Sequence, residues 1–146
     1  MILVTKNNMA HYKQLLQINT SGKSLSRITS KVEEAVAKSG IKTGLCNLFL
    51  RHTSASLIIQ ENADPDVLTD LENFISKLVP EGAHYTHSTE GPDDMPAHIR
   101  SVLTHTSEQI PIIDGKLVLG TWQGIYVWEH RQDSHSRELV IYISGE

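Results

Sequence analysis

Residues 110–144 read IPIIDGKLVLGTWQGIYVWEHRQDSHSRELVIYIS. Two apolar runs, 110–113 and 116–119, flank the pair Asp114-Gly115, which tolerates the positive φ angles of a type I′ turn. The spacing therefore predicts a β-hairpin with a two-residue turn. Two more segments of strand length complete this end of the chain, Gly124–His130 and Glu138–Ser144.

Upstream of this region, three more segments have the length and composition of strands. Tyr12–Asn19 ends at a Ser-Gly pair, and Gly44–Arg51 and Ser56–Gln60 are apolar runs separated by a few polar residues. Cys46 lies inside one of these runs, where a buried, unreactive thiol is the usual interpretation.

Helical spacing appears between the strands. Ile28, Val32 and Val36 recur at i, i+4 and i+8, and Gly40 follows as a C-terminal cap, which predicts a helix over residues 25–39.

A second helix begins after Asp64-Pro65, a capping side chain followed by a first-turn proline, and ends at Pro80. Its apolar residues recur at helical spacing: Val67, Leu71, Phe74 and Leu78.

A third, shorter helix is predicted from Pro96 to about His105, capped by Asp93 or Asp94. We expect it to turn Ile99, Val102 and Leu103 inward. Residues 81–94 before it have no apolar period, and a loop of this length invites a functional interpretation.

Strands and helices alternate without a linker or a repeat, so they must share one core. The predicted fold is a single compact α+β domain with largely antiparallel sheets, sandwich-like, and about three helices. Residues 1–8 are interpreted as an N-terminal extension and residues 9–146 as the domain.

The net charge is −4, with thirteen basic and seventeen acidic residues, which argues against recognition of nucleic acid or of a membrane through bulk charge. The apolar start of the sequence is too short for a signal peptide, and a single cysteine allows no internal disulfide. We therefore expect a cytoplasmic protein.

Histidine is the unusual feature of the composition, with eight in 146 residues. His52 continues the face of a predicted strand, His98 faces the core side of the third helix, and His87 precedes that helix. If these three imidazoles converge, a zinc-like divalent metal would satisfy them. The alternative is a set of separate core histidines, each bonded to a backbone carbonyl. His84 and His135 are expected to be bystanders.

Two buried charges are also predicted. Glu129 shares strand parity with Ile125 and Val127, and Arg137 shares parity with Leu139 and the apolar residues beyond it. A buried Glu and a buried Arg need each other or a ligand. The two glycines that bracket Thr121 and Gln123 suggest a bulge that directs side chains toward a site, or a purely structural strand corner.

Several motifs occur together in one order: FLRHTSASL (49–57), EN (61–62), DMPAHI (94–99), LGTWQGI (119–125) and EHR (129–131). With them, the sequence resembles the secondary thiamine-phosphate synthase family, also called the YjbQ family, from about Met9 to Glu146. The resemblance implies a homotrimer with His52, His87 and His98 in a metal pocket. It also implies the joining of hydroxymethylpyrimidine diphosphate to thiazole phosphate, with release of pyrophosphate. The family's name refers to a secondary activity, so the main reaction is left open.

The small phosphorylated substrate of such a reaction needs cationic and polar partners. We expect contacts from Arg131 and Arg137, which can stabilise a leaving pyrophosphate. The other expected contacts are Ser54, Asn62, Thr121 and Gln123. Imidazole ligands favour zinc over magnesium.

Two other functions stay open. A metal-dependent phosphate-ester hydrolase would use Glu61 or Glu129 as the proton acceptor. A non-catalytic small-molecule or metal-binding protein would use the pocket for affinity alone.

Overall fold

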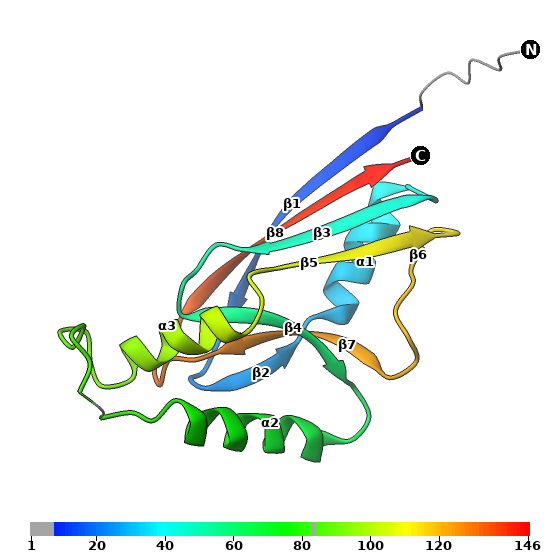
Figure 1. The fold of residues 1–146 in the computed structure, drawn as a ribbon. Helices are drawn as coiled ribbons and strands as arrows, with labels where there is room; N and C mark the ends of the chain where they lie inside the picture. Colours follow the sequence, from blue (N-terminus) through cyan, green and yellow to red (C-terminus); the bar gives the residue numbers. More distant parts are fainter. Residues whose placement is uncertain (1–7, 83) are drawn as a thin grey trace, which may run out of the picture.

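Two antiparallel sheets form the frame of the molecule. The computed structural model describes residues 8–82 and 84–146. One sheet has the strand order β1-β8-β3-β5-β6 and the other has the order β2-β7-β4 (Figure 1). The strands are β1 Ala10–Asn19, β2 Ser24–Arg27, β3 Gly44–Leu50, β4 Ala55–Glu61, β5 Ser107–Ile113, β6 Lys116–Leu117, β7 Gln123–Glu129 and β8 Ser136–Gly145.

The main core lies between the two sheets. It contains Leu48 of β3, Leu57 of β4, Val127 of β7 and Ile141 of β8, all of which are fully buried. Helix α1 (Thr29–Ser39) closes this core with Val32 and other apolar residues. Burial of these side chains is the main stabilising contribution, since each contributes roughly 1.5–3 kcal/mol.

Helix α2 (Pro65–Leu78) covers the outer face of the three-stranded sheet, as Figure 1 shows. A second apolar cluster there joins Ile75 and Val79 to Tyr126 and Trp128 of β7. The outer face of the five-stranded sheet has no such cover within the described part of the chain. Leu15, Leu45 and Phe49 are exposed on its strands.

Several sequence predictions are confirmed. The described residues form the predicted compact α+β domain, with three helices and two antiparallel sheets. Asp114 and Gly115 form the predicted hairpin turn with φ of 53° and 76°. Gly40 ends α1 with φ of 68°, and the Asp64 side chain accepts a hydrogen bond from the Asp66 amide at 2.9 Å. Cys46 is buried, and burial raises the pKa of its thiol to about 12.

The predicted helix over residues 25–39 begins too early. Ser24–Arg27 is a strand that pairs with β7, and α1 starts only at Thr29. Pairing with β7 outweighs the helical spacing of this segment, because it gives the backbone of an otherwise open sheet edge its hydrogen bonds. The predicted strand 116–119 is also shorter, since β6 contains only Lys116 and Leu117.

Helical spacing alone did not identify the buried face of α2, where Phe74 and Leu78 are exposed and Ile75 is buried. Of the residues expected to face inward on helix α3 (Asp94–Leu103), Ile99 packs against the second apolar cluster, but 82% of Val102 and 53% of Leu103 are exposed. Asp94, Ala97 and Arg100 face inward instead. Burial of Asp94 and Arg100 is possible because each finds hydrogen-bonding partners.

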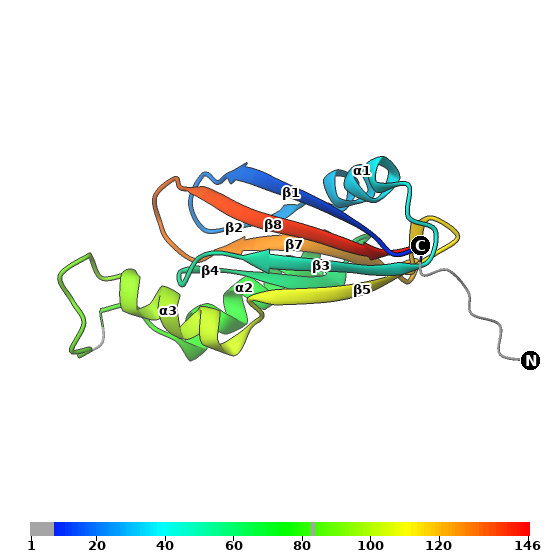
Figure 2. The ribbon, with the colours of Figure 1, turned by 90° about the horizontal axis from the view of Figure 1, so that it is seen from above.

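The two ends of the sandwich differ. The loop after α2 and helix α3 lie at the end opposite the C-terminus (Figure 2). Within the described ranges, every helix is too short or too polar to cross a membrane. The prediction that residues 1–8 form an extension falls almost entirely outside the described residues, and β1 begins at Ala10.

Candidate metal centre

Helix α3 and the loop before it bring together two imidazoles and a carboxylate. Asp94 and His98 are four residues apart on α3, so their side chains lie on one face of the helix. His87 joins them from the loop. One ligand atom from each of the three residues lies within 4.8 Å of the other two.

The hydrogen bonds of His98 determine which ring nitrogen faces the centre. Nδ1 lies 2.8 Å from the carbonyl oxygen of Thr53, which can only accept, so Nδ1 carries the hydrogen and donates. In the neutral ring, Nε2 then has a free lone pair. This Nε2 lies 3.1 Å from Asp94 Oδ2, which is also an acceptor. Two acceptors facing each other need a cation between them, either a proton or a metal ion.

His87 approaches the same carboxylate oxygen. Its Nε2 lies 2.6 Å from Asp94 Oδ2, and the rings of His87 and His98 have their centroids 5.6 Å apart. Asp94 is buried, whereas 41% of the His87 side chain and 30% of the His98 side chain are exposed. The carboxylate is therefore the buried member of the group, and the two imidazoles are the members that solvent can reach.

The electrostatics keep the carboxylate of Asp94 charged. Burial alone would raise its pKa, but hydrogen bonds, led by the one from His87, and the charge of Arg131 outweigh burial, so the pKa lies below its usual range. Arg131 NH1 donates to the other oxygen, Oδ1, at 2.7 Å. An ionised carboxylate and two imidazoles form a donor set that suits zinc and related transition metals.

His52, the third predicted ligand, does not share this group. Its Nε2 accepts a hydrogen bond from the Glu138 amide at 2.7 Å, so that lone pair is occupied. Its Nδ1 lies 3.4 Å from Arg137 NH1. Burial, and then the Arg137 charge, lower the pKa of His52, which keeps the ring neutral. The carboxylate of Asp94 takes the place that the sequence assigned to His52.

Glu129 and Arg137 form the buried ion pair expected from strand parity. The carboxylate of Glu129 is fully buried and accepts five hydrogen bonds, three of them from Thr20 and the amides of His130 and Arg131 and two from Arg137. Burial would raise the pKa of Glu129, but these bonds, led by Arg137, lower it overall. Glu129 is therefore a structural carboxylate and not an available proton acceptor.

The predicted substrate contacts are distributed over three places. Arg131 lies beside the centre, where it donates to Asp94. Ser54 and Arg137 lie in the buried pair's network, where Arg137 Nη2 donates to Ser54 Oγ at 3.0 Å. Asn62, Thr121 and Gln123 lie at the far end of β4, roughly 20 Å from its start by the rise of a seven-residue strand. Glu61, a predicted proton acceptor, is the last residue of β4 at this far end.

The turn over residues 120–123 at this far end is held by hydrogen bonds of its own residues and of Asn62. Asn62 Nδ2 donates to the carbonyl oxygens of Thr121 and Gln123, and the Gln123 side chain accepts from the Gly120 amide at 2.7 Å. This is the structural strand corner that the sequence left open as an alternative, and within one chain these side chains do not reach the metal centre.

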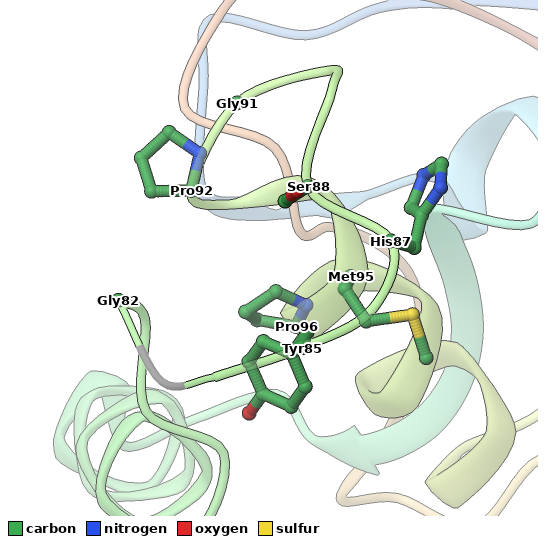
Figure 3. Close-up of a pocket in the computed structure, with 8 residues that line it drawn as sticks. All are labelled: Gly82, Tyr85, His87, Ser88, Gly91, Pro92, Met95 and Pro96. Atoms are coloured by element: carbon green, nitrogen blue, oxygen red, sulfur yellow. The ribbon is translucent and has the colours of Figure 1, made fainter.

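Shallow depressions flank the centre. One, of about 330 Å³, is lined by residues of the loop and α3, and Figure 3 shows Tyr85, Met95 and Pro96 as the apolar part of its lining. His87 also lines it. A second, of about 250 Å³, contains His52 and His98. A ligand bound to the centre therefore has room on both sides.

Asp94 is the member of this group that the sequence did not assign to it. It was considered as a helix cap and as part of the motif at residues 94–99, although Asp93 holds the N-cap position and makes no side-chain cap bond. The available signal was the spacing of Asp94 and His98, which places a carboxylate and an imidazole one helical turn apart. Asp93 instead accepts from Arg131 Nε at 2.9 Å and from the Gln132 amide.

The sequence was compared with known protein families. The family described as UPF0047 protein YjbQ-like matches residues 14–146. The chain belongs to this family. A UPF0047 protein of Synechocystis is 64% identical over 136 residues, which covers 92% of both chains. The UPF0047 protein YjbQ of Escherichia coli is 38% identical, covering 92% of this chain and 99% of that one.

Solved structures of YjbQ-like proteins have the same fold. A YbjQ-like protein of unknown function from Sulfolobus solfataricus matches with a TM-score of 0.89 and 28% identity, covering 95% of this chain and all of that one. A YjbQ/UPF0047 family protein from Clostridium acetobutylicum matches with a TM-score of 0.83 and 39% identity, covering 89% and 98%. The resemblance to the YjbQ family is confirmed, and the thiamine-phosphate synthase reaction that it implied stays a prediction.

Proposed function

We propose that this YjbQ-like protein binds a zinc-like divalent ion through His87, Asp94 and His98 and acts on a small phosphorylated substrate. The observation that carries the metal proposal is the geometry of His98. Its Nδ1 is held by the Thr53 carbonyl, and its Nε2 faces Asp94 Oδ2 at 3.1 Å. Metal-binding histidines usually donate their other ring nitrogen to a carbonyl or carboxylate oxygen in this way.

For the reaction itself, we propose the thiamine-phosphate synthase reaction. The thiazole nitrogen of one substrate would form a C–N bond to the methylene carbon of hydroxymethylpyrimidine diphosphate, and the C–O bond to the diphosphate would break with both electrons leaving on the pyrophosphate. A bound divalent ion supplies a Lewis acid for the leaving oxygens. The Tyr85, Met95 and Pro96 side chains offer an apolar surface beside it for a flat heterocycle.

One observation favours a second candidate, the hydrolysis of a phosphate ester. Both arginines that were expected to bind pyrophosphate are committed to carboxylates, Arg131 to Asp93 and Asp94, and Arg137 to Glu129. A single phosphate group needs fewer cations than a leaving pyrophosphate. Hydrolysis of a phosphate ester, which needs only one substrate, is therefore the alternative reaction that the experiments below must distinguish.

The test begins with zinc affinity, measured by competition with a chelator for the wild type and four single variants. His87→Ala, Asp94→Asn and His98→Ala should each lose more than the roughly 10- to 100-fold typical of outer-shell substitutions, and their losses should not add in double variants. Binding should weaken as the pH falls, because a protonated imidazole cannot bind a metal. The control, His84→Ala, alters an exposed loop histidine and should bind like the wild type.

His52→Ala separates the two ligand sets. With its lone pair already occupied by the Glu138 amide, His52 should contribute little affinity. A large loss in this variant would return it to the ligand set. Near-wild-type affinity in any of the three ligand variants would remove that residue, and a wild-type protein that binds no zinc would refute the metal proposal.

The reaction is then tested on the zinc-loaded protein. Thiamine phosphate and pyrophosphate formed in equal amounts from the two precursors, and lost after chelation, are the expected result. Phosphate released from a simple ester without a second substrate would favour the hydrolase. Zinc binding without any product would support the non-catalytic alternative.

We further propose that the protein works in the cytoplasm as a homotrimer. The single buried cysteine is compatible with a reducing compartment. Exposed apolar side chains on the five-stranded sheet and on α3 support an assembly that covers them. They include Leu15, Phe49, Val102 and Leu103.

A further inference from the structure

The guanidinium of Arg131 is bonded at all three of its nitrogens. Nε donates to Asp93 Oδ2 at 2.9 Å, NH1 donates to Asp94 Oδ1 at 2.7 Å, and NH2 donates to the Glu90 carbonyl oxygen at 2.9 Å. Only 17% of this side chain is exposed. One arginine therefore fastens the end of the loop that carries His87 and the first turn of α3.

The two oxygens of Asp94 have separate partners. Oδ1 accepts from Arg131, whereas Oδ2 faces the Nε2 atoms of both His87 and His98. A carboxylate with one oxygen held in a charge-assisted hydrogen bond cannot rotate freely about its last bond. The bond to Arg131 thus fixes which lone pairs of Asp94 are presented to the centre.

Arg131 is itself held by the buried ion pair. Its amide donates to Glu129 Oε2 at 3.2 Å. Arg137, the partner of Glu129, donates to the Ser54 carbonyl oxygen at 3.2 Å, next to the Thr53 carbonyl that orients His98. The residues that orient Asp94 and His98 are therefore both connected by hydrogen bonds to one fully buried carboxylate, that of Glu129.

We propose that Arg131 is a positioning residue of the metal centre, which fixes the carboxylate of Asp94 for the ion and does not serve as a substrate-binding cation. This inference rests on the proposed metal site. The competing role is an arginine that binds the phosphate of the substrate. Each terminal nitrogen keeps a second N–H, but the other three N–H groups hold the guanidinium against Asp93, Asp94 and the Glu90 carbonyl, and only 17% of the side chain is exposed.

The experiment measures zinc affinity for the wild type, Arg131→Met and Arg131→Lys by chelator competition. Arg131→Met should lose roughly 10- to 100-fold, the range typical of outer-shell partners of a ligand. Arg131→Lys should lose less, because an ammonium keeps the charge but cannot bond Asp93 and Asp94 in the planar fork of a guanidinium. Arg51→Met removes an arginine from a surface pair with Glu138 and should leave the affinity unchanged.

A double-mutant cycle separates positioning from a general loss of structure. In the Asp94→Asn background, Arg131→Met should cost little further affinity, because the group that it positions is already altered. A cobalt-substituted sample should show a changed absorption spectrum in Arg131→Met at full occupancy, which a merely less stable protein would not. If Arg131→Met does not fold, the same comparisons are made with Arg131→Lys.

The outcomes distinguish the two proposals. Zinc binding by the wild type with unchanged affinity and an unchanged cobalt spectrum in both Arg131 variants would overturn the positioning role and leave the metal site standing. Equal losses for Arg131→Met in the wild-type and Asp94→Asn backgrounds would also overturn it. Absence of zinc binding in the wild type would instead refute the proposed function.

Discussion

At the scale of single residues, His130 should make the free energy of unfolding depend on pH. It is fully buried, with Nε2 2.8 Å from Ser56 Oγ, and its Nδ1 has no hydrogen-bond partner among the described residues. Burial lowers its pKa to about 3, and the charges of Arg100 and Arg137 add to this effect. In the unfolded chain the value is near 6.5. The unfolded chain therefore takes up this proton first as the pH falls.

The free energy of unfolding should consequently be highest above about pH 6.5 and should fall as the pH drops toward 3. We expect His130 to account for on the order of 2 kcal/mol of loss between about pH 7 and about pH 4.5. His130→Gln should flatten this dependence, measured by urea unfolding at several pH values. The exposed control, His84→Gln, should leave it unchanged, and an equally steep fall in His130→Gln would contradict the assignment.

Single residues also show where sequence reasoning was sufficient. Strand parity predicted that Glu129 and Arg137 are buried, because parity alone fixes which side of a sheet a residue faces, and it left open whether they pair with each other or with a ligand. The replacement of His52 by Asp94 could not be predicted in this way. It depends on which backbone groups meet each imidazole, namely the Glu138 amide at His52 and the Thr53 carbonyl at His98.

Among the elements, the junction of α1 with β7 depends on one hydroxyl. The Ile125 amide donates to Thr29 Oγ1 at 2.9 Å in a buried position. Thr29→Val keeps the shape but leaves this amide without an acceptor, and should cost about 1–3 kcal/mol of unfolding free energy. Thr69→Val on the exposed surface of α2 is the matched control. A loss no larger in Thr29→Val than in Thr69→Val would show that the bond contributes nothing.

Local patterns predicted the existence of each helix better than its orientation. Cap and turn residues such as Asp64, Gly40 and Asp114 act on their immediate neighbours, so they could be interpreted from sequence. The orientation of α3 depends on distant partners. Arg100, buried at 1% exposure, bonds Glu72 and Ser76 of α2 and thereby turns the polar face of α3 inward.

For the whole molecule, the proposed trimer can be tested by mass. Analytical ultracentrifugation at micromolar concentration should give three times the 16.3 kDa of one chain. Phe49→Lys, on the uncovered face of the five-stranded sheet, should lower the mass, because it places a charge among exposed apolar side chains. Phe74→Lys on α2 should not. A wild-type mass of a single chain would refute the assembly.

The position of β8 has a consequence for how the protein is made. This last strand lies between β1 and β3, and its pairings run from Asn19↔Ser136 to Ala10↔Gly145 on one side. A nascent chain that still has residues 136–145 inside the ribosome therefore exposes two apolar strands that lack their common neighbour. The larger sheet can form only after residues 136–145 have left the ribosome, so slow emergence or loss of β8 should favour aggregation over folding.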